Sequence, residues 1–234
     1  MSPATSWLPG RRRAASGPDG SMRPMSDSYL TIATTAEAQI EVKRSRFLAR
    51  LERAADEAAA LAVVEAARKR HWDARHHCSA YILGPGSEIQ RASDDGEPSG
   101  TAGAPMLDCL RGRGLSDVVA VVTRWFGGTL LGAGGLIRAY SEALREAVEA
   151  AGVSERRHVQ RVSVAMAHGD AGRLENELRA HGVLVADVVY EALATLVLDV
   201  TTSQRAGLDQ LVAQLTGGQA HVVDHEWRWC DVTP

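Results

Sequence analysis

Residues 118–152 read VVAVVTRWFGGTLLGAGGLIRAYSEALREAVEAAG. Apolar, largely β-branched residues fill 118–122 and the run continues to Arg124, which is typical of a strand buried on both faces. From Leu136 onward the apolar residues recur at helical spacing until Gly152, which can end a helix. The stretch therefore predicts a central strand, a glycine-rich turn and a long amphipathic helix.

The glycine-rich turn is the first candidate binding site. It contains Gly127, Gly128, Gly132, Gly134 and Gly135. Glycine tolerates positive φ and close approach, and a helix start presents free N–H groups and the positive end of its dipole. We expect the N–H groups of Gly134 and Gly135, together with Arg124 and Arg138 on either side, to hold a phosphate. A steric interpretation stays open, in which the glycines only allow close packing. The spacing matches neither GxGxxG nor GxxxxGK[ST], which argues against a dinucleotide or P-loop site.

Composition indicates a two-domain, non-membrane protein. The 234 residues are 45% hydrophobic and 24% charged, and no apolar run approaches the roughly 18 residues of a membrane span. Three cysteines without a CxxC pair argue against a disulfide framework or zinc cluster, so we expect a cytoplasmic protein. As a separate expectation, the protein is a monomer. Residues 1–25 carry a charge of +3 and the remainder −6, so any RNA contact requires a local basic patch.

The chain divides into three parts. Residues 1–26 are rich in Pro, Gly, Ser and Arg and are expected to be a disordered tail, with Met22 or Met25 as a plausible true start. A first domain is expected at 27–153 and a second at 158–234, with the boundary near the polar residues VSERRH. The second has a β-α-β-β-α-β pattern, which predicts a ferredoxin-like fold, so the fold class is α+β.

The first domain is expected to begin with strands and a capped helix. Strands are predicted at 29–33, 39–43, 47–51, 76–84 and 89–92, and helices at 57–70 and 105–113. Asp56 is the expected N-cap of the first helix, and Pro105 is the expected first residue of the second. The cations of KRSRF at 43–47 stand beside an aromatic residue, a cluster that fits either a phosphate contact or a solvated face.

A loop dense in acids is the second candidate site. Asp94, Asp95 and Glu97 follow the strand predicted at 89–92, which is the expected partner of the strand that begins with His76 and His77. Carboxylates and one histidine could hold Mg²⁺, which is the cofactor expected if this loop binds a metal. Adjacent histidines on a strand point to opposite faces, so only one of the two could join such a site. No spaced pair of metal ligands commits the loop to a metal site. In the alternative interpretation Asp95 and Gly96 form a turn and the acids cap backbone N–H groups.

Ser99 and Thr101 complete the candidate set. Nothing like GxSxG surrounds a serine, so a triad nucleophile is not indicated. These hydroxyls are expected to cap the helix near Pro105 or to line the same pocket as the glycines.

Three long motifs resemble those of a known family. HHCSAYILG at 76–84, SDDGEPSGTAGAPML at 93–107 and VVTRWFGGTLLGAGGLIRAY at 121–140 look like the signature of the IMPACT family, in its bacterial YigZ-type branch. The likeness runs from about Tyr29 to the C-terminus, with Trp125 where the family usually has tyrosine. It implies a βαβ-type first domain shared with a ribosomal-protein domain and GHMP kinases, and a second domain similar to the last domain of elongation factor G.

Three functional hypotheses follow. The resemblance implies eukaryotic relatives that carry an additional partner-binding domain and restrain a starvation-responsive kinase pathway controlling translation initiation. We do not expect that additional domain within these 234 residues. The leading hypothesis is a translation- or stress-linked regulator that binds RNA, the ribosome or a phosphate-bearing ligand at the glycine-rich turn. The alternatives are a Mg²⁺-dependent enzyme with His76 or His77 as acid or base, and a protein-interaction module without a ligand.

Overall fold

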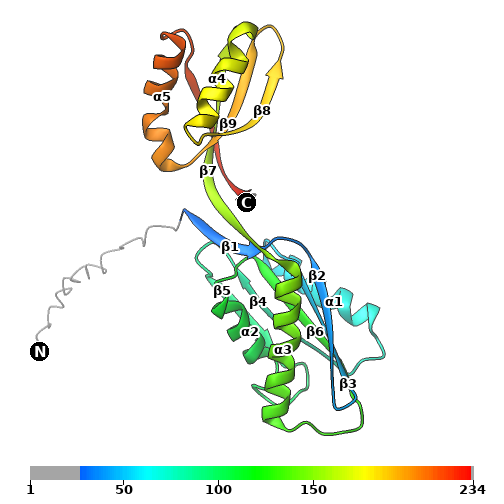
Figure 1. The fold of residues 1–234 in the computed structure, drawn as a ribbon. Helices are drawn as coiled ribbons and strands as arrows, with labels where there is room; N and C mark the ends of the chain where they lie inside the picture. Colours follow the sequence, from blue (N-terminus) through cyan, green and yellow to red (C-terminus); the bar gives the residue numbers. More distant parts are fainter. Residues whose placement is uncertain (1–26, 233–234) are drawn as a thin grey trace, which may run out of the picture.

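The computed structural model describes residues 27–232, so the expectation for the 1–26 tail lies outside the described residues. Two lobes are joined at a narrow waist (Figure 1). The strands are β1 (Ser28–Ile32), β2 (Ala36–Val42), β3 (Ser45–Arg53), β4 (His76–Leu83), β5 (Ile89–Ser93), β6 (Val118–Trp125), β7 (Val153–Met166), β8 (Leu184–Tyr190), β9 (Ala194–Val200) and β10 (Val222–Val232). The helices are α1 (Glu57–Arg70), α2 (Gly103–Gly112), α3 (Ala133–Ala151), α4 (His168–Ala180) and α5 (Thr202–Thr216). Five helices and two antiparallel sheets in the described chain confirm the α+β class.

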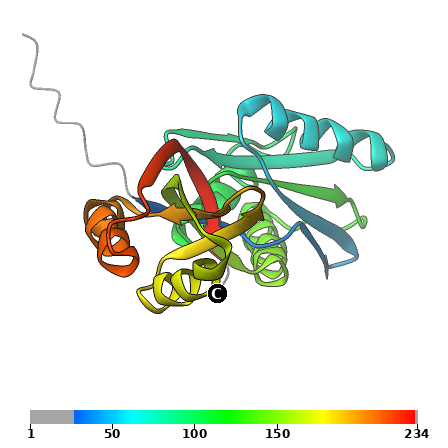
Figure 2. The same cartoon turned by 90° about the horizontal axis from the view of Figure 1, so that it is seen from above.

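The N-terminal lobe is a sheet of order β2-β3-β6-β4-β5 between two helical layers. Its central strand β6 is buried on both faces, as its sequence predicts: Val118, Ala120 and Val122 join one apolar core, and Val119 and Val121 join another. The first core lies under α2 and α3 and the second under α1, and Figure 2 shows α1 on the opposite side of the sheet from α3.

Strand pairing shows how α1 crosses this sheet. β3 and β4 both pair antiparallel with β6, so they run parallel to each other, with α1 connecting them. The β3–α1–β4 unit therefore joins two parallel strands that are not adjacent in the sheet, because β6 lies between them. Asp56 caps α1 as expected, because its side chain accepts a hydrogen bond from the N–H of Ala59 at 2.8 Å.

The C-terminal lobe has the predicted β-α-β-β-α-β element order. Its strands lie in the order β10-β7-β9-β8, and α4 and α5 pack on the face that carries Val162, Val164 and Leu196. Several boundaries differ from expectation. α2 begins at Gly103, two residues before Pro105, its expected first residue. β7 begins at Val153, so residues 153–158, placed at the domain boundary, belong to a continuous strand. α3 begins at Ala133, one turn before Leu136.

The waist consists of β1 and the ends of β7 and β10. β1 pairs with Val153–Arg157 of β7, and the last residues of β10 pair with the same segment on its other edge. Arg53 of β3 donates to Asp231 at 2.8 Å, and Tyr29 of β1 bonds to Asp117, which immediately precedes β6. Polar side chains therefore fasten the waist to the N-terminal lobe.

Candidate ligand-binding cavity

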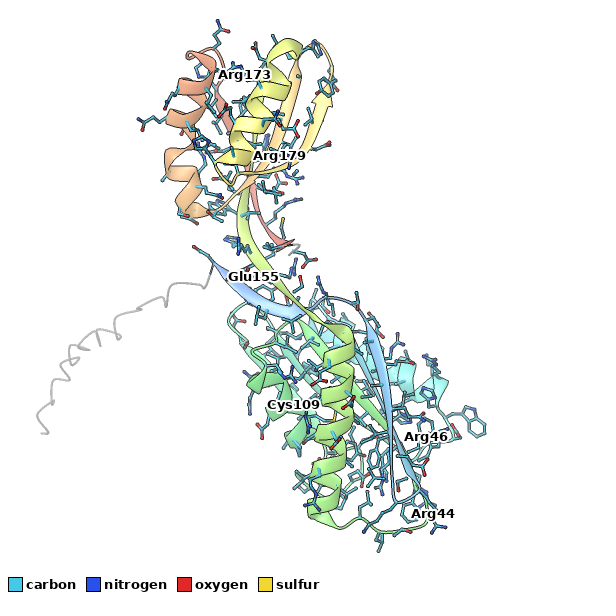
Figure 3. All side chains as sticks on the ribbon, viewed as in Figure 1. Arg44, Arg46, Cys109, Glu155, Arg173 and Arg179 are labelled. Atoms are coloured by element: carbon cyan, nitrogen blue, oxygen red, sulfur yellow. The ribbon has the colours of Figure 1, made fainter. Side chains whose placement is uncertain are left out.

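The glycine-rich turn and the acidic loop, far apart in sequence, meet around one cavity of about 390 Å³ in the N-terminal lobe. It is lined by Arg75, His76, Glu97, Pro98, Arg124, Phe126, Leu130, Leu131, Gly132, Ala133 and Leu136. The turn follows β6 at the end of the lobe farther from the C-terminal lobe, where Arg44 and Arg46 also lie (Figure 3). Of the predicted site residues, the fold brings His76, Glu97, Arg124 and Gly132 to this cavity.

The acidic loop is held in shape by its own carboxylates. Asp94 accepts hydrogen bonds from the N–H groups of Gly100, Ala102 and Gly103 at 2.8–3.0 Å. Burial raises the pKa of Asp94, but these three amides outweigh it and lower the pKa overall. Asp95 lies in a tight turn and has a φ of 42°. The N–H of Glu97 closes this turn by donating a hydrogen bond to the carbonyl oxygen of Asp94. The turn-and-cap interpretation of Asp94 and Asp95 is therefore confirmed.

Asp94 caps the start of α2 in place of Ser99 and Thr101, the expected capping residues. The first residues of α2 receive no hydrogen bond from Ser99 or Thr101, and the Thr101 hydroxyl donates instead to the carbonyl of Pro98 at 2.6 Å. Neither residue lines the cavity. The expected capping by Ser99 and Thr101 is wrong, because the carboxylate of Asp94 already reaches the amides at the start of α2.

Glu97 and Arg124 form a buried ion pair beside the cavity. The Arg124 Nη1 atom lies 2.6 Å from Glu97 Oε1, and the two side chains are 6% and 3% exposed. The Tyr140 hydroxyl of α3 donates to the same Oε1 at 2.8 Å. The sequence predicts Arg124 as one of the cations that hold a phosphate at the turn. Glu97 instead neutralises it, and no residue within 27–232 accepts from its Nε.

A short polar chain continues behind this pair. The thiol of Cys78 on β4 lies 3.2 Å from the Tyr140 hydroxyl and 3.0 Å from the Asp94 carbonyl oxygen. Burial raises the pKa of Cys78 to about 12, which keeps it a neutral thiol at physiological pH. Cys78 and Tyr140 thus position the acidic loop against α3 and supply no nucleophile.

The five glycines have different roles. A Cβ on Gly127 would lie 2.0 Å from the carbonyl carbon of Arg44, so close packing against the β2–β3 turn requires glycine. Gly128 and Gly132 have φ of 86° and 71°. The N–H of Gly135 donates to the carbonyl of Gly132 at 3.1 Å, so it is not available to a ligand, contrary to expectation. Around Gly134 a side chain would meet open space.

Two amides remain available where α3 begins. Among the described residues, none accepts a hydrogen bond from the N–H of Ala133 or Gly134, which are the first two residues of the helix. Gly132 and Ala133 line the cavity. Arg138 is exposed on α3 and is not a lining residue. The two free amides are therefore those of Ala133 and Gly134 instead of Gly134 and Gly135, and Arg138 does not line the cavity with them.

The two histidines face opposite sides of the sheet, as expected. His76 lines the cavity, and its Nδ1 donates to the carbonyl oxygen of Asp95 at 2.9 Å, which leaves Nε2 unprotonated in the neutral ring. His77 is buried, with Nδ1 3.2 Å from the Thr123 hydroxyl. Burial lowers the pKa of His77. The nearby Asp95 carboxylate opposes this effect, and positive neighbours such as Arg68 add to it.

Sequence reasoning missed the cation and the apolar wall of the cavity. Arg75 lines it and makes no hydrogen bond or ion pair with any part of the chain that the structure describes. Phe126, Leu130 and Leu131 also line it, and Leu130 is 83% exposed. Two adjacent leucines inside a glycine-rich turn were the available signal, since solvent-facing turns are usually polar.

No metal cluster stands out in this region. Within residues 27–232, no group of three or more His, Cys, Asp or Glu side chains is arranged to hold a metal ion. Asp95 accepts from the N–H of His77 and from Arg68, both at 2.7 Å. All three carboxylates considered for Mg²⁺ therefore already have protein donors.

Comparison with known proteins identifies the family. The Impact N-terminal domain matches residues 43–148, and a domain of unknown function, DUF1949, matches residues 164–219. The IMPACT family member YvyE of Bacillus subtilis is 39% identical over 202 residues, which is 86% of this chain and 93% of that protein. This chain belongs to the IMPACT family. The IMPACT family member YigZ of Escherichia coli is 45% identical over 124 residues, covering 52% of this chain and 61% of YigZ.

A solved structure shares the fold of this IMPACT protein. It is described as a crystal structure of a hypothetical protein, with 32% sequence identity and a TM-score of 0.57. The likeness covers 86% of this chain and 98% of the other. Among helices of the described residues, none is both long and apolar enough to cross a membrane.

Proposed function

We propose that this IMPACT family member is a binding protein whose N-terminal lobe holds a phosphate-bearing ligand in the cavity at the start of α3. Its single strongest support is that Arg75, which has no partner in the described chain, and Ala133, whose N–H has no protein acceptor, line the same cavity, with the free N–H of Gly134 next in the chain. These donors and the positive end of a 19-residue helix attract an anion. Arg124 contributes little net charge because it is paired with Glu97.

The rest of the cavity suits an organic group attached to the phosphate. Phe126, Leu131 and Leu136 supply apolar lining, and the Phe126 ring centre lies 5.6 Å from the guanidinium carbon of Arg124. A volume of about 390 Å³ lies within the roughly 300–1,000 Å³ of small-molecule sites, so a nucleotide unit fits better than a bare anion.

RNA, alone or in the ribosome, is the partner we infer for this site. At the same end of the lobe, Lys43 and Arg44 form the β2–β3 turn, and the Arg46 guanidinium lies 3.8 Å from the ring centre of Trp125. Cations interleaved with aromatic rings suit single-stranded nucleic acid. The strand order β10-β7-β9-β8 with two crossover helices also supports a ferredoxin-like C-terminal lobe, in keeping with a translation- or stress-linked regulator.

The enzyme alternative has weaker support. A Mg²⁺-dependent reaction would use Asp94, Asp95 and Glu97, and each of these carboxylates already accepts hydrogen bonds from the protein. His76 is the one histidine at the cavity, and its Nδ1 is engaged by Asp95. A protein-interaction module without a ligand would leave the free amides and Arg75 without a role.

The test is RNA binding across a salt series. A mixed-sequence ten-nucleotide RNA is titrated into the full chain, its Arg75→Ala variant and the matched control Arg145→Ala. Arg145 is exposed on α3, twelve residues beyond Ala133, or about 18 Å along the helix. We expect affinity to fall with salt, and Arg75→Ala to weaken binding and reduce the salt slope by about one. Affinity that ignores both salt and Arg75→Ala would reject the proposal.

A further inference from the structure

The Glu97 carboxylate keeps one oxygen without a protein partner. Arg124 and Tyr140 both donate to Oε1, at 2.6 and 2.8 Å, and no residue in the described chain donates to Oε2. The Glu97 side chain is 3% exposed, but Oε2 does not belong to the fully buried side-chain atoms that lack a hydrogen-bond partner, so it keeps some contact with solvent. Glu97 lines the cavity, and Oε2 is the oxygen of its carboxylate that the protein leaves without a donor.

This oxygen is held in a fixed position. Arg124 extends from the sheet and Tyr140 from α3, so Glu97 is gripped from two elements, and Asp94 fixes the loop that carries it. The ion pair with Arg124 makes the carboxylate an acceptor only. A largely buried carboxylate oxygen without a donor is costly, and a ligand N–H group would satisfy it.

Nucleobases differ in the donors that they can offer this oxygen. Guanine carries N1–H and N2–H₂ side by side on its pairing edge, so it can donate to Oε2 from either group. Adenine places the N1 acceptor beside its amino group, and uracil places carbonyl oxygens on both sides of N3–H, so each brings a lone pair against the carboxylate. Cytosine offers its N4 amino group but follows it with the N3 acceptor.

We propose that the ligand of this site is a guanine nucleotide, either free or as one nucleotide of a single-stranded RNA. The base lies against Phe126 and donates to Glu97 Oε2, while its phosphate reaches the amides of Ala133 and Gly134. This inference rests on the proposed phosphate site and adds the identity of the base.

The experiment changes the ligand and leaves the fold intact. Calorimetric titration of the full chain uses GMP, AMP, CMP, UMP, 1-methyl-GMP and inorganic phosphate. One hydrogen bond to a charged group corresponds to about a ten- to hundredfold change in affinity. We expect GMP to bind tighter than each other base by at least about tenfold, and 1-methyl-GMP to lose affinity because its methyl group replaces the N1 proton.

Variants and RNA supply the remaining arms. Glu97→Gln should reduce the preference for GMP over AMP, and Phe126→Ala should weaken all nucleotides while keeping that preference. RNA hexamers with one guanine or none distinguish the two sources: tighter binding of the guanine hexamer than of GMP indicates RNA, and the reverse indicates a free nucleotide. Equal affinity for GMP and AMP would overturn the guanine assignment while leaving the phosphate site standing. Absence of binding by every nucleotide and by phosphate would overturn both.

Discussion

Replacing Glu97 with glutamine tests the buried pair on which the cavity is built. The substitution keeps the side-chain volume but leaves the Arg124 guanidinium, 6% exposed, without its counter-charge. Breaking a buried ion pair by removing one partner costs about 3–5 kcal/mol. Glutamine can still accept from Tyr140, so we expect about 3 kcal/mol, or roughly a 6–12 °C fall in the melting temperature of a chain this size.

The assay is urea unfolding of four proteins: wild type, Glu97→Gln, Arg124→Met and the double variant. The double variant removes the uncompensated charge, so it should recover at least about 1 kcal/mol relative to the sum of the single variants. The surface pair of Arg179 with Glu175, where the arginine is 50% exposed, is the control, and Glu175→Gln should cost less than about 0.5 kcal/mol. A Glu97→Gln cost as small as the control, or strictly additive costs, would refute the reasoning.

Three further predictions concern the loops and the first helix. Gly127→Ala should destabilise the fold by more than about 3 kcal/mol because its Cβ would meet the backbone of Arg44, whereas Gly134→Ala, in open helical space, should raise the melting temperature slightly; equal effects would contradict the packing argument. The pKa of Asp94 is lower in the folded chain than in the unfolded one, so its stabilisation is present above about pH 4 and is lost as pH falls through the folded pKa. An Asp94→Asn variant should therefore be less stable than wild type at pH 7 and approach it in acid, and a pH-independent difference would count against this. Asp56→Ala should cost about 1 kcal/mol in thermal unfolding through loss of the α1 cap, and an unchanged melting temperature would argue against that cap.

Much of the fold could be predicted because its local signals agree with each other. The apolar run of β6, the Asp56 cap and the glycine after α3 each determine an element boundary without reference to the rest of the chain. The continuity of β7 through its polar start was less accessible. The first residues of β7 pair with β1 and β10, which are distant in sequence, so the local sequence pattern does not predict a strand there.

The candidate site was predictable in outline only. The acidic loop and the glycine-rich turn were both recognised, but the partner of each charged group depends on tertiary contacts. Arg124 stands beside glycines in the sequence and beside Glu97 in the fold, which changes it from an anion ligand into half of a buried pair. Arg75 carries no motif, and only the meeting of β4 with the turn before α3 brings it to the cavity.

The central claim concerns two backbone amides, and nuclear magnetic resonance can observe them directly. The full chain, labelled with ¹⁵N, is titrated with GMP and separately with inorganic phosphate. If a phosphate binds at the start of α3, the Ala133 and Gly134 amide signals shift progressively and saturate, while those of Gly135 and Arg145 move less. Saturable binding that leaves the Ala133 and Gly134 signals in place would contradict the account.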